Sequence, residues 1–64
     1  MVKLEMICNA PDTVMVYVNP DNVLYCVDHG NTVTMIHFGD RRPIAVIGNY
    51  EQVASKLEDA RKNR

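Results

Sequence analysis

The period of the hydrophobic pattern changes once along this chain, after Gly48. Before that glycine, apolar residues recur at every second position in short runs, which is typical of β-strands. Beyond it, Tyr50, Val53 and Leu57 follow the spacing of one helical face. A chain whose strands all precede one amphipathic helix is restricted to an α+β fold with the helix laid on a sheet.

Five strand-like runs are separated by segments rich in Pro, Gly, Asn and Asp, the residues that favour turns. The runs are Val2–Cys8, Val14–Val18, Val23–Asp28, Thr32–Phe38 and Pro43–Ile47. The turns are Asn9–Asp12, Asn19–Asn22, His29–Asn31 and Gly39–Arg42. We therefore predict one domain over residues 1–64, a five-stranded, mainly antiparallel β-meander with one C-terminal α-helix packed on the sheet.

The expected helix carries start and stop signals. Asn49 is a preferred N-cap, and Gln52 stands three residues later, where it can return a bond to the cap amide. Lys62 and Arg64 lie where positive charge stabilises the negative end of a helix. We expect the helix to begin near Tyr50 and to continue almost to the end of the chain.

The small size of the domain favours self-association. A chain of 64 residues buries only about 60% of the surface that its unfolded state exposes, so association with another subunit is a common source of stability. One helix covers only part of a five-stranded sheet, and the remaining face carries apolar residues. We expect this face to meet a second copy, as a dimer or a higher symmetric oligomer, or a partner protein.

Charge and cysteine content point to a protein of the cytoplasm. The net charge of -1 argues against the broad positive surface that binding to a phosphate backbone requires. Cys8 and Cys26 fall in expected strands, where they behave as small apolar residues, so we expect reduced thiols. The opening residues 1–5 have no basic run before an apolar stretch, and no apolar run approaches the roughly 20 residues that cross a bilayer.

A metal or catalytic site is not expected. Cys26 and His29 have a ligand-like spacing, but a zinc site would require Cys8 and His37 to converge on them. A nucleophile arrangement of Cys26, Asp28 and His29 is disfavoured because neighbouring strand residues point to opposite faces. The glycines are isolated and form no phosphate loop. We expect no enzyme, no catalytic residue and no cofactor.

Candidate interaction residues combine aromatic rings on expected strands with basic residues at a turn and at the helix end. They are Tyr17, Tyr25, His37, Arg41, Arg42, Arg61 and Lys62. Together with Phe38 and Arg64 they support an alternative function, a regulator that stacks nucleic-acid bases on its sheet. The other interpretation of these charges is complementarity at the helix end and a solvated turn.

Residues 18–57 resemble the FlbD-type family of small bacterial flagellar and swarming proteins. The shared pattern consists of the corner and strand Val18–Val23, the strand Thr32–Phe38, the turn residue Gly39, the short strand ending at Val46 and the helix start Tyr50–Val53. Asn9–Asp12 stands where that family has a glycine-containing hairpin, and Asp40–Arg42 replaces its lysine-rich turn. The resemblance implies a bacterial or phage accessory protein without enzymatic activity that works through contacts with other proteins.

Overall fold

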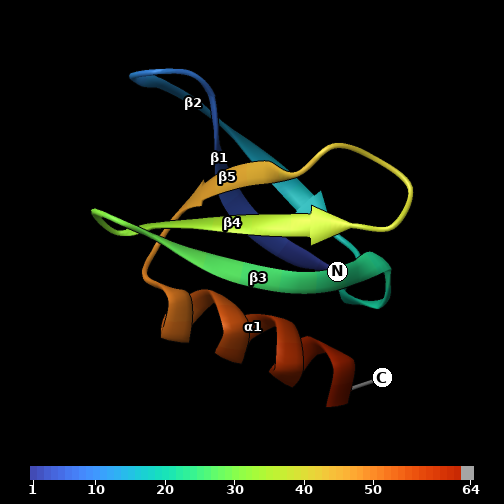
Figure 1. Cartoon of the computed structure of the whole chain (residues 1–64). Helices are drawn as coiled ribbons and strands as arrows, with labels where there is room; N and C mark the ends of the chain where they lie inside the picture. The colour runs from blue at the N-terminus through green and yellow to red at the C-terminus, as the bar shows by residue number, and fades with distance from the viewer. Residues whose placement is uncertain (63–64) are drawn as a thin grey trace.

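The computed structural model describes residues 1–62, and these residues form an antiparallel sheet with a helix packed on it (Figure 1). The elements are β1 (Val2–Asn9), β2 (Asp12–Val18), the short 3-10 helix η1 (Pro20–Asn22), β3 (Val23–Gly30), β4 (Val33–Phe38), β5 (Ile44–Ile47) and α1 (Tyr50–Lys62). The predicted α+β class, with a five-stranded sheet and a C-terminal helix over this part of the chain, is confirmed.

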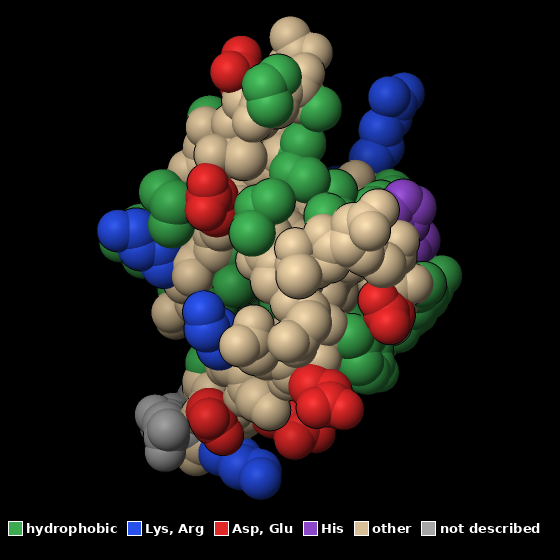
Figure 2. Space-filling model, turned by 90° about the vertical axis from the view of Figure 1, so that its left-hand side faces the viewer, with side chains coloured by type: hydrophobic (Ala, Val, Ile, Leu, Met, Phe, Trp, Pro, Cys, Tyr) green, Lys and Arg blue, Asp and Glu red, His purple; other side chains and the backbone are tan. Residues whose placement is uncertain are grey.

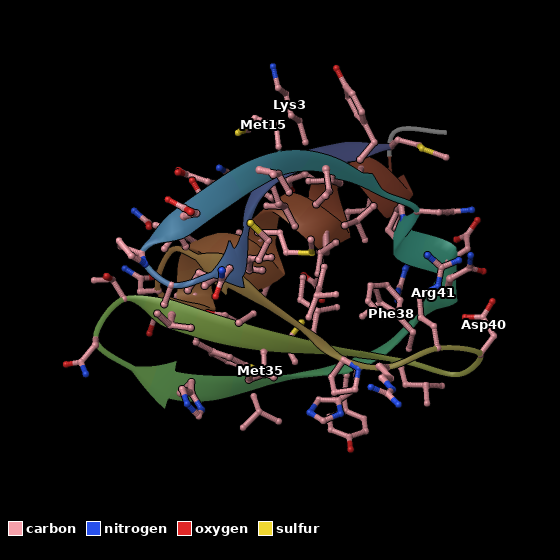
Figure 3. All side chains as sticks on the ribbon, turned by 90° about the horizontal axis from the view of Figure 1, so that it is seen from above. Lys3, Met15, Met35, Phe38, Asp40 and Arg41 are labelled. Atoms are coloured by element: carbon pink, nitrogen blue, oxygen red, sulfur yellow. The ribbon has the colours of Figure 1, made fainter. Side chains whose placement is uncertain are left out.

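The strand order is β2-β1-β5-β4-β3. β1 and β2 form one hairpin, β3, β4 and β5 form a meander, and β5 joins the two units by pairing Val46 with Met6 of β1. The chain therefore crosses from one edge of the sheet, β2, to the other edge, β3, through η1. The sheet coils, so the β1–β2 half and the β3–β4 half face each other across an apolar interior (Figure 3).

The crossing at η1 is the tight corner that the sequence predicts. The Asn19 side-chain oxygen accepts a hydrogen bond from the Asp21 amide at 3.0 Å, and the Asn22 amide donates to the Asn19 carbonyl at 3.0 Å. Pro20 is buried beneath the corner. Asn and Asp side chains hold such corners by bonding nearby backbone groups, and here they connect the two edges of the sheet through a tight turn.

The inner face of the sheet and α1 share one hydrophobic core. Its buried members are Val2, Leu4, Val18, Ile36, Val46, Val53 and Leu57. The helix contacts β3, η1, β1 and β4. Val53 and Leu57 of the predicted apolar stripe are buried, whereas Tyr50 at its start is 42% exposed. Thr34 is fully buried among the core residues, and its hydroxyl donates to the Gly48 carbonyl at 2.9 Å.

The start of α1 follows the predicted cap. The Asn49 side chain accepts from the Gln52 amide at 2.9 Å, and the Asn49 carbonyl accepts from the Val53 amide at 3.1 Å. Gly48 has a φ of 135°, and a Cβ at this position would lie 3.1 Å from Val53. Glycine is therefore needed between β5 and the helix. The predicted contribution of Arg64 lies outside the described residues.

Candidate interaction surfaces

Tyr25 and His37 form a stacked pair on the outer face of the sheet. They are cross-strand neighbours on β3 and β4, and their ring centroids lie 4.5 Å apart with the planes inclined by 14°. Tyr25 is 54% exposed. Directly opposed strand residues point to the same side of a sheet, so the sequence pattern that placed aromatic rings on both strands produces a flat, accessible aromatic surface.

Tyr17 lies on a different side of the molecule. It is opposite Lys3 on the outer face of β1 and β2. Lys3 and Met15 point outward from the β1–β2 half at the top of the view, whereas Met35 lies on the β3–β4 half below (Figure 3). Because Tyr25 shares the Met35 face, Tyr17 and Tyr25 do not form one stacking platform.

Phe38 does not extend the aromatic surface either. It follows His37 directly, so it points to the inner face, where it packs against the core. The Arg41 guanidinium lies over its ring, 5.6 Å from the centroid, and pairs with Asp40 at 3.5 Å. A cation over an aromatic face is attracted by the ring quadrupole. Arg41 therefore borders the interior instead of projecting from the outer face.

The basic residues of the helix end have separate environments. The Arg61 guanidinium donates to the Pro20 carbonyl at 2.9 Å, which ties the last turn of α1 to η1. Arg61 also lines, with Tyr25, a hollow of about 210 Å³ between β3 and α1. Lys62 and Arg42 are exposed. Arg61 therefore has a structural role, which Lys62 and Arg42 do not share in the contacts described for residues 1–62.

The outer face of β3, β4 and β5 is apolar over most of its area. The register places seven residues on it, which we call the outer patch: Tyr25, Val27, Val33, Met35, His37, Ala45 and Ile47. Val27 is 42% and Ile47 is 41% exposed. None of the seven is Lys, Arg, Asp or Glu, which is unusual for the uncovered side of an antiparallel sheet.

A groove of about 530 Å³ opens between the two halves of the sheet. Val16 and Val18 of β2 line one side, and Phe38 and Ile44 line the other. Arg41 stands at its rim. Figure 3 looks into this space and shows Phe38 pointing into it, with Arg41 beside it and the helix behind. Its volume falls within the range of about 300–1,000 Å³ found for ligand sites.

The candidate metal ligands lie on different parts of the chain. Cys26 faces the core, His37 stacks on Tyr25, His29 sits at the exposed hairpin turn and Cys8 is exposed near the other hairpin turn. Within residues 1–62, no three His, Cys, Asp or Glu side chains are grouped as a metal site. Burial raises the pKa of the Cys26 thiol, which disfavours its thiolate.

Charged side chains of both signs are interspersed on the end of the molecule that carries the hairpin tips and the start of α1 (Figure 2). Neither sign forms a continuous patch on that face. Strong binding to a phosphate backbone depends on clustered positive charge. This end of the molecule therefore offers no electrostatic footprint for nucleic acid.

Comparison of the chain with protein-family models, with curated proteins and with solved structures finds no match. The resemblance to the FlbD-type family thus stays a prediction. No helix within residues 1–62 is long and apolar enough to cross a membrane.

The sequence-based candidates omitted most residues of the outer patch and of the groove. Val27, Met35 and Ile47 read as ordinary strand positions, because alternation shows which residues share a face but not which face is covered. Val16 and Ile44 line the groove because β1 pairs with β5. The sequence did contain one indication of an exposed apolar face. In these strands the residues at even and at odd positions are both largely apolar, so whichever set faces outward exposes apolar side chains.

Proposed function

We propose that this chain is a non-enzymatic protein-interaction module that self-associates through its outer patch. The observation that supports this most directly is the exposure of an apolar face, with Val27 and Ile47 each about two-fifths accessible. Monomeric proteins rarely leave such a surface in water. The patch contains no Lys, Arg, Asp or Glu, so two copies can meet without repulsion between such charges.

The geometry suits a twofold dimer in which the patch meets itself. Such an interface is isologous, so each apolar residue needs only an apolar partner on the same patch of the other copy. A standard interface buries roughly 800 Å² per partner, which is under a fifth of the 4530 Å² surface of the chain. The extended outer faces of β3, β4 and β5 provide a surface of the required kind.

We place the module in the cytoplasm as an accessory protein that binds other proteins. Two free cysteines, Cys8 and Cys26, suit a reducing compartment. The resemblance of residues 18–57 to flagellar and swarming proteins supports the same role. Catalysis is not part of the proposal.

The test is the mass in solution, measured by size-exclusion chromatography with light scattering at micromolar concentration. We expect a multiple of 7.3 kDa for the wild type and a folded monomer for Val27→Lys, which puts charge into the patch. Met15→Lys is the matched control, because Met15 is 55% exposed on the other half of the sheet. A wild-type mass of one chain would refute self-association.

A second candidate, binding of single-stranded nucleic acid, is supported by the Tyr25–His37 stack. Base stacking on an exposed aromatic ring contributes about 1–3 kcal/mol per base, and the exposed Arg42 lies in the turn that follows β4. Titration with mixed oligonucleotides should then show retention that weakens with salt and with Tyr25→Ala. Absence of retention at low ionic strength would eliminate this candidate.

A further inference from the structure

The free edge of β2 lacks the features that normally protect a sheet edge. β2 is seven residues long, and its residues 13–18 contain no charge and no proline. Val14, Met15 and Tyr17 are 44%, 55% and 67% exposed. The opposite edge, β3, lies against α1. Natural proteins blunt exposed edges with Lys, Pro, bulges or a covering element, so β2 resembles an edge kept open for pairing.

The groove runs along this same edge. Val16, Tyr17 and Val18 all line it, and Tyr17 belongs to the outer face of β2. Three consecutive residues from both faces can border one groove only along the edge of the strand, and the other edge of β2 is paired with β1. Unpaired backbone groups and an apolar groove therefore adjoin each other.

We propose that β2 accepts an extended segment of a partner protein as an additional strand, whose alternate side chains enter the groove. Strand addition of this kind derives affinity from main-chain hydrogen bonds and specificity from pockets for every second side chain. The groove is lined mainly by apolar side chains, among them Val16, Phe38 and Ile44. The inserted side chains are therefore apolar.

The rim of the groove selects the charge of the segment. Residues 39–43 carry Arg41 and Arg42 against a single Asp40, and the Arg41–Asp40 pair is well exposed. A carboxylate on the incoming segment complements this excess of positive charge. A second copy pairing through its own β2 would not supply this carboxylate, because residues 13–18 carry no charge.

This inference rests on the protein-binding part of the proposed function and is independent of self-association through the outer patch. The two surfaces lie on different sides of β4 and β5, since the groove is lined from the inner face. A variant that becomes monomeric should retain strand addition. The mass measurement and the peptide titration can therefore fail separately.

The experiment is a titration of the labelled full chain with short capped peptides, followed by backbone amide shifts and hydrogen exchange. The probes alternate Val, Leu or Phe with Thr and carry a glutamate at one end. We expect saturable shifts and slowed exchange at residues 13–18, unchanged in Val27→Lys. The scrambled peptides, in which the apolar residues are contiguous, should leave these amides unaffected.

Charge reversal at the rim provides the matched test. Arg41→Glu should weaken binding of the glutamate peptide roughly two- to fivefold, the range expected for an exposed ion pair. The same variant should bind more tightly the peptide that carries lysine in place of the glutamate. Arg42→Glu is the control for net charge and should have a smaller effect. The proposal is overturned if no alternating peptide protects residues 13–18, if the shifts map to the outer patch, or if rising protein concentration alone protects β2, which would make a second copy the occupant.

Discussion

Over β3, β4 and β5 the two faces of the sheet are similarly apolar but differ in what covers them. On β5, Val46 points to the inner face and is fully buried, whereas its neighbour Ile47 points outward and is 41% exposed. On β3 and β4 the same division separates Ile36 from Val27. The inner face has α1 across it, and the outer face has no element of residues 1–62 packed on it. Covering elements, rather than composition, decide which apolar residues become core.

The contrast has an energetic meaning. Burying apolar area stabilises by about 25 cal/mol per Å², so the inner residues account for most of the stability of the fold. The outer residues add little to the isolated chain and can contribute only when a further surface covers them. A functional interpretation of the outer patch therefore depends on separating its effect on folding from its effect on association.

The largest expected effect comes from matched truncations on the two faces. Ile36→Ala removes a fully buried side chain and should lower the free energy of unfolding by about 2–5 kcal/mol. Ile47→Ala should lower it by no more than about 1 kcal/mol in the isolated chain. Urea unfolding followed by circular dichroism measures both.

Repeating this measurement at several protein concentrations sharpens the contrast. Association makes the apparent stability depend on protein concentration. If the outer patch is an interface, Ile47→Ala should reduce that dependence and Ile36→Ala should not. Equal losses of stability for the two variants at the lowest concentration would show that Ile47 belongs to the core of the monomer, and would contradict the division between a buried inner face and an exposed outer face.

A smaller effect is expected from the polar residue on the inner face. Thr34→Val keeps the shape of the side chain but removes the donor to the Gly48 carbonyl. An unsatisfied buried acceptor costs about 1–3 kcal/mol. Thr34→Ser is the control, because it keeps the hydroxyl and loses one methyl group. In thermal unfolding, Thr34→Val should have a lower melting temperature than Thr34→Ser. The reverse order would indicate that the hydrogen bond contributes less to stability than the methyl contact.

A still smaller loss of stability is expected at the C-terminal end of α1. Arg61→Met removes the bond to the Pro20 carbonyl that joins α1 to η1, so we expect a loss of about 1 kcal/mol in the free energy of unfolding. Lys62→Met, at the neighbouring exposed position, should change it by less than about 0.5 kcal/mol. Chemical unfolding at moderate salt measures the free energy of unfolding of both variants. Equal losses would mean that the stability of the helix end depends on net charge and not on the Arg61–Pro20 hydrogen bond.

The smallest effect concerns the two thiols. Burial raises the pKa of Cys26, so its reactive thiolate is scarcer than that of an exposed thiol at the same pH. Iodoacetamide at mildly alkaline pH should modify Cys8 first, as mass spectrometry of timed digests can show. Because the folded pKa is raised, the unfolded chain ionises Cys26 first, and stability should fall as pH rises above the ordinary thiol range. Replacing Cys26 by Ala should reduce that alkaline slope.

Local features of the fold were predictable because short-range chemistry sets them. The Asn19 corner, the Asn49 cap and the apolar stripe with Val53 and Leu57 all occur as predicted. The turn at His29–Asn31 also takes the expected positive φ, at 81° for Gly30 and 52° for Asn31. Each depends on side chains within a few residues of one another.

The candidate site was less predictable, because it depends on partners distant in sequence. The sequence grouped Tyr17 with Tyr25 as strand aromatics, yet coiling of the sheet puts them on different sides. It assigned Arg61 either to nucleic-acid binding or to charge complementarity at the helix end, yet this residue also binds a carbonyl 41 positions away. Alternation assigns residues to a face of their own strand and leaves the relation between strands open.

The amino-acid sequence by itself determined where strands, turns and the helix lie, since hydrophobic period, caps and turn residues act locally. Tertiary structure alone decided that β5 joins β1, that α1 covers the inner face, and that a groove remains beside the open edge of β2. The physical reason is that both faces of β3, β4 and β5 are largely apolar. Because these strands have no polar face to assign to solvent, the side that becomes core depends on long-range strand pairing and on the position taken by the helix.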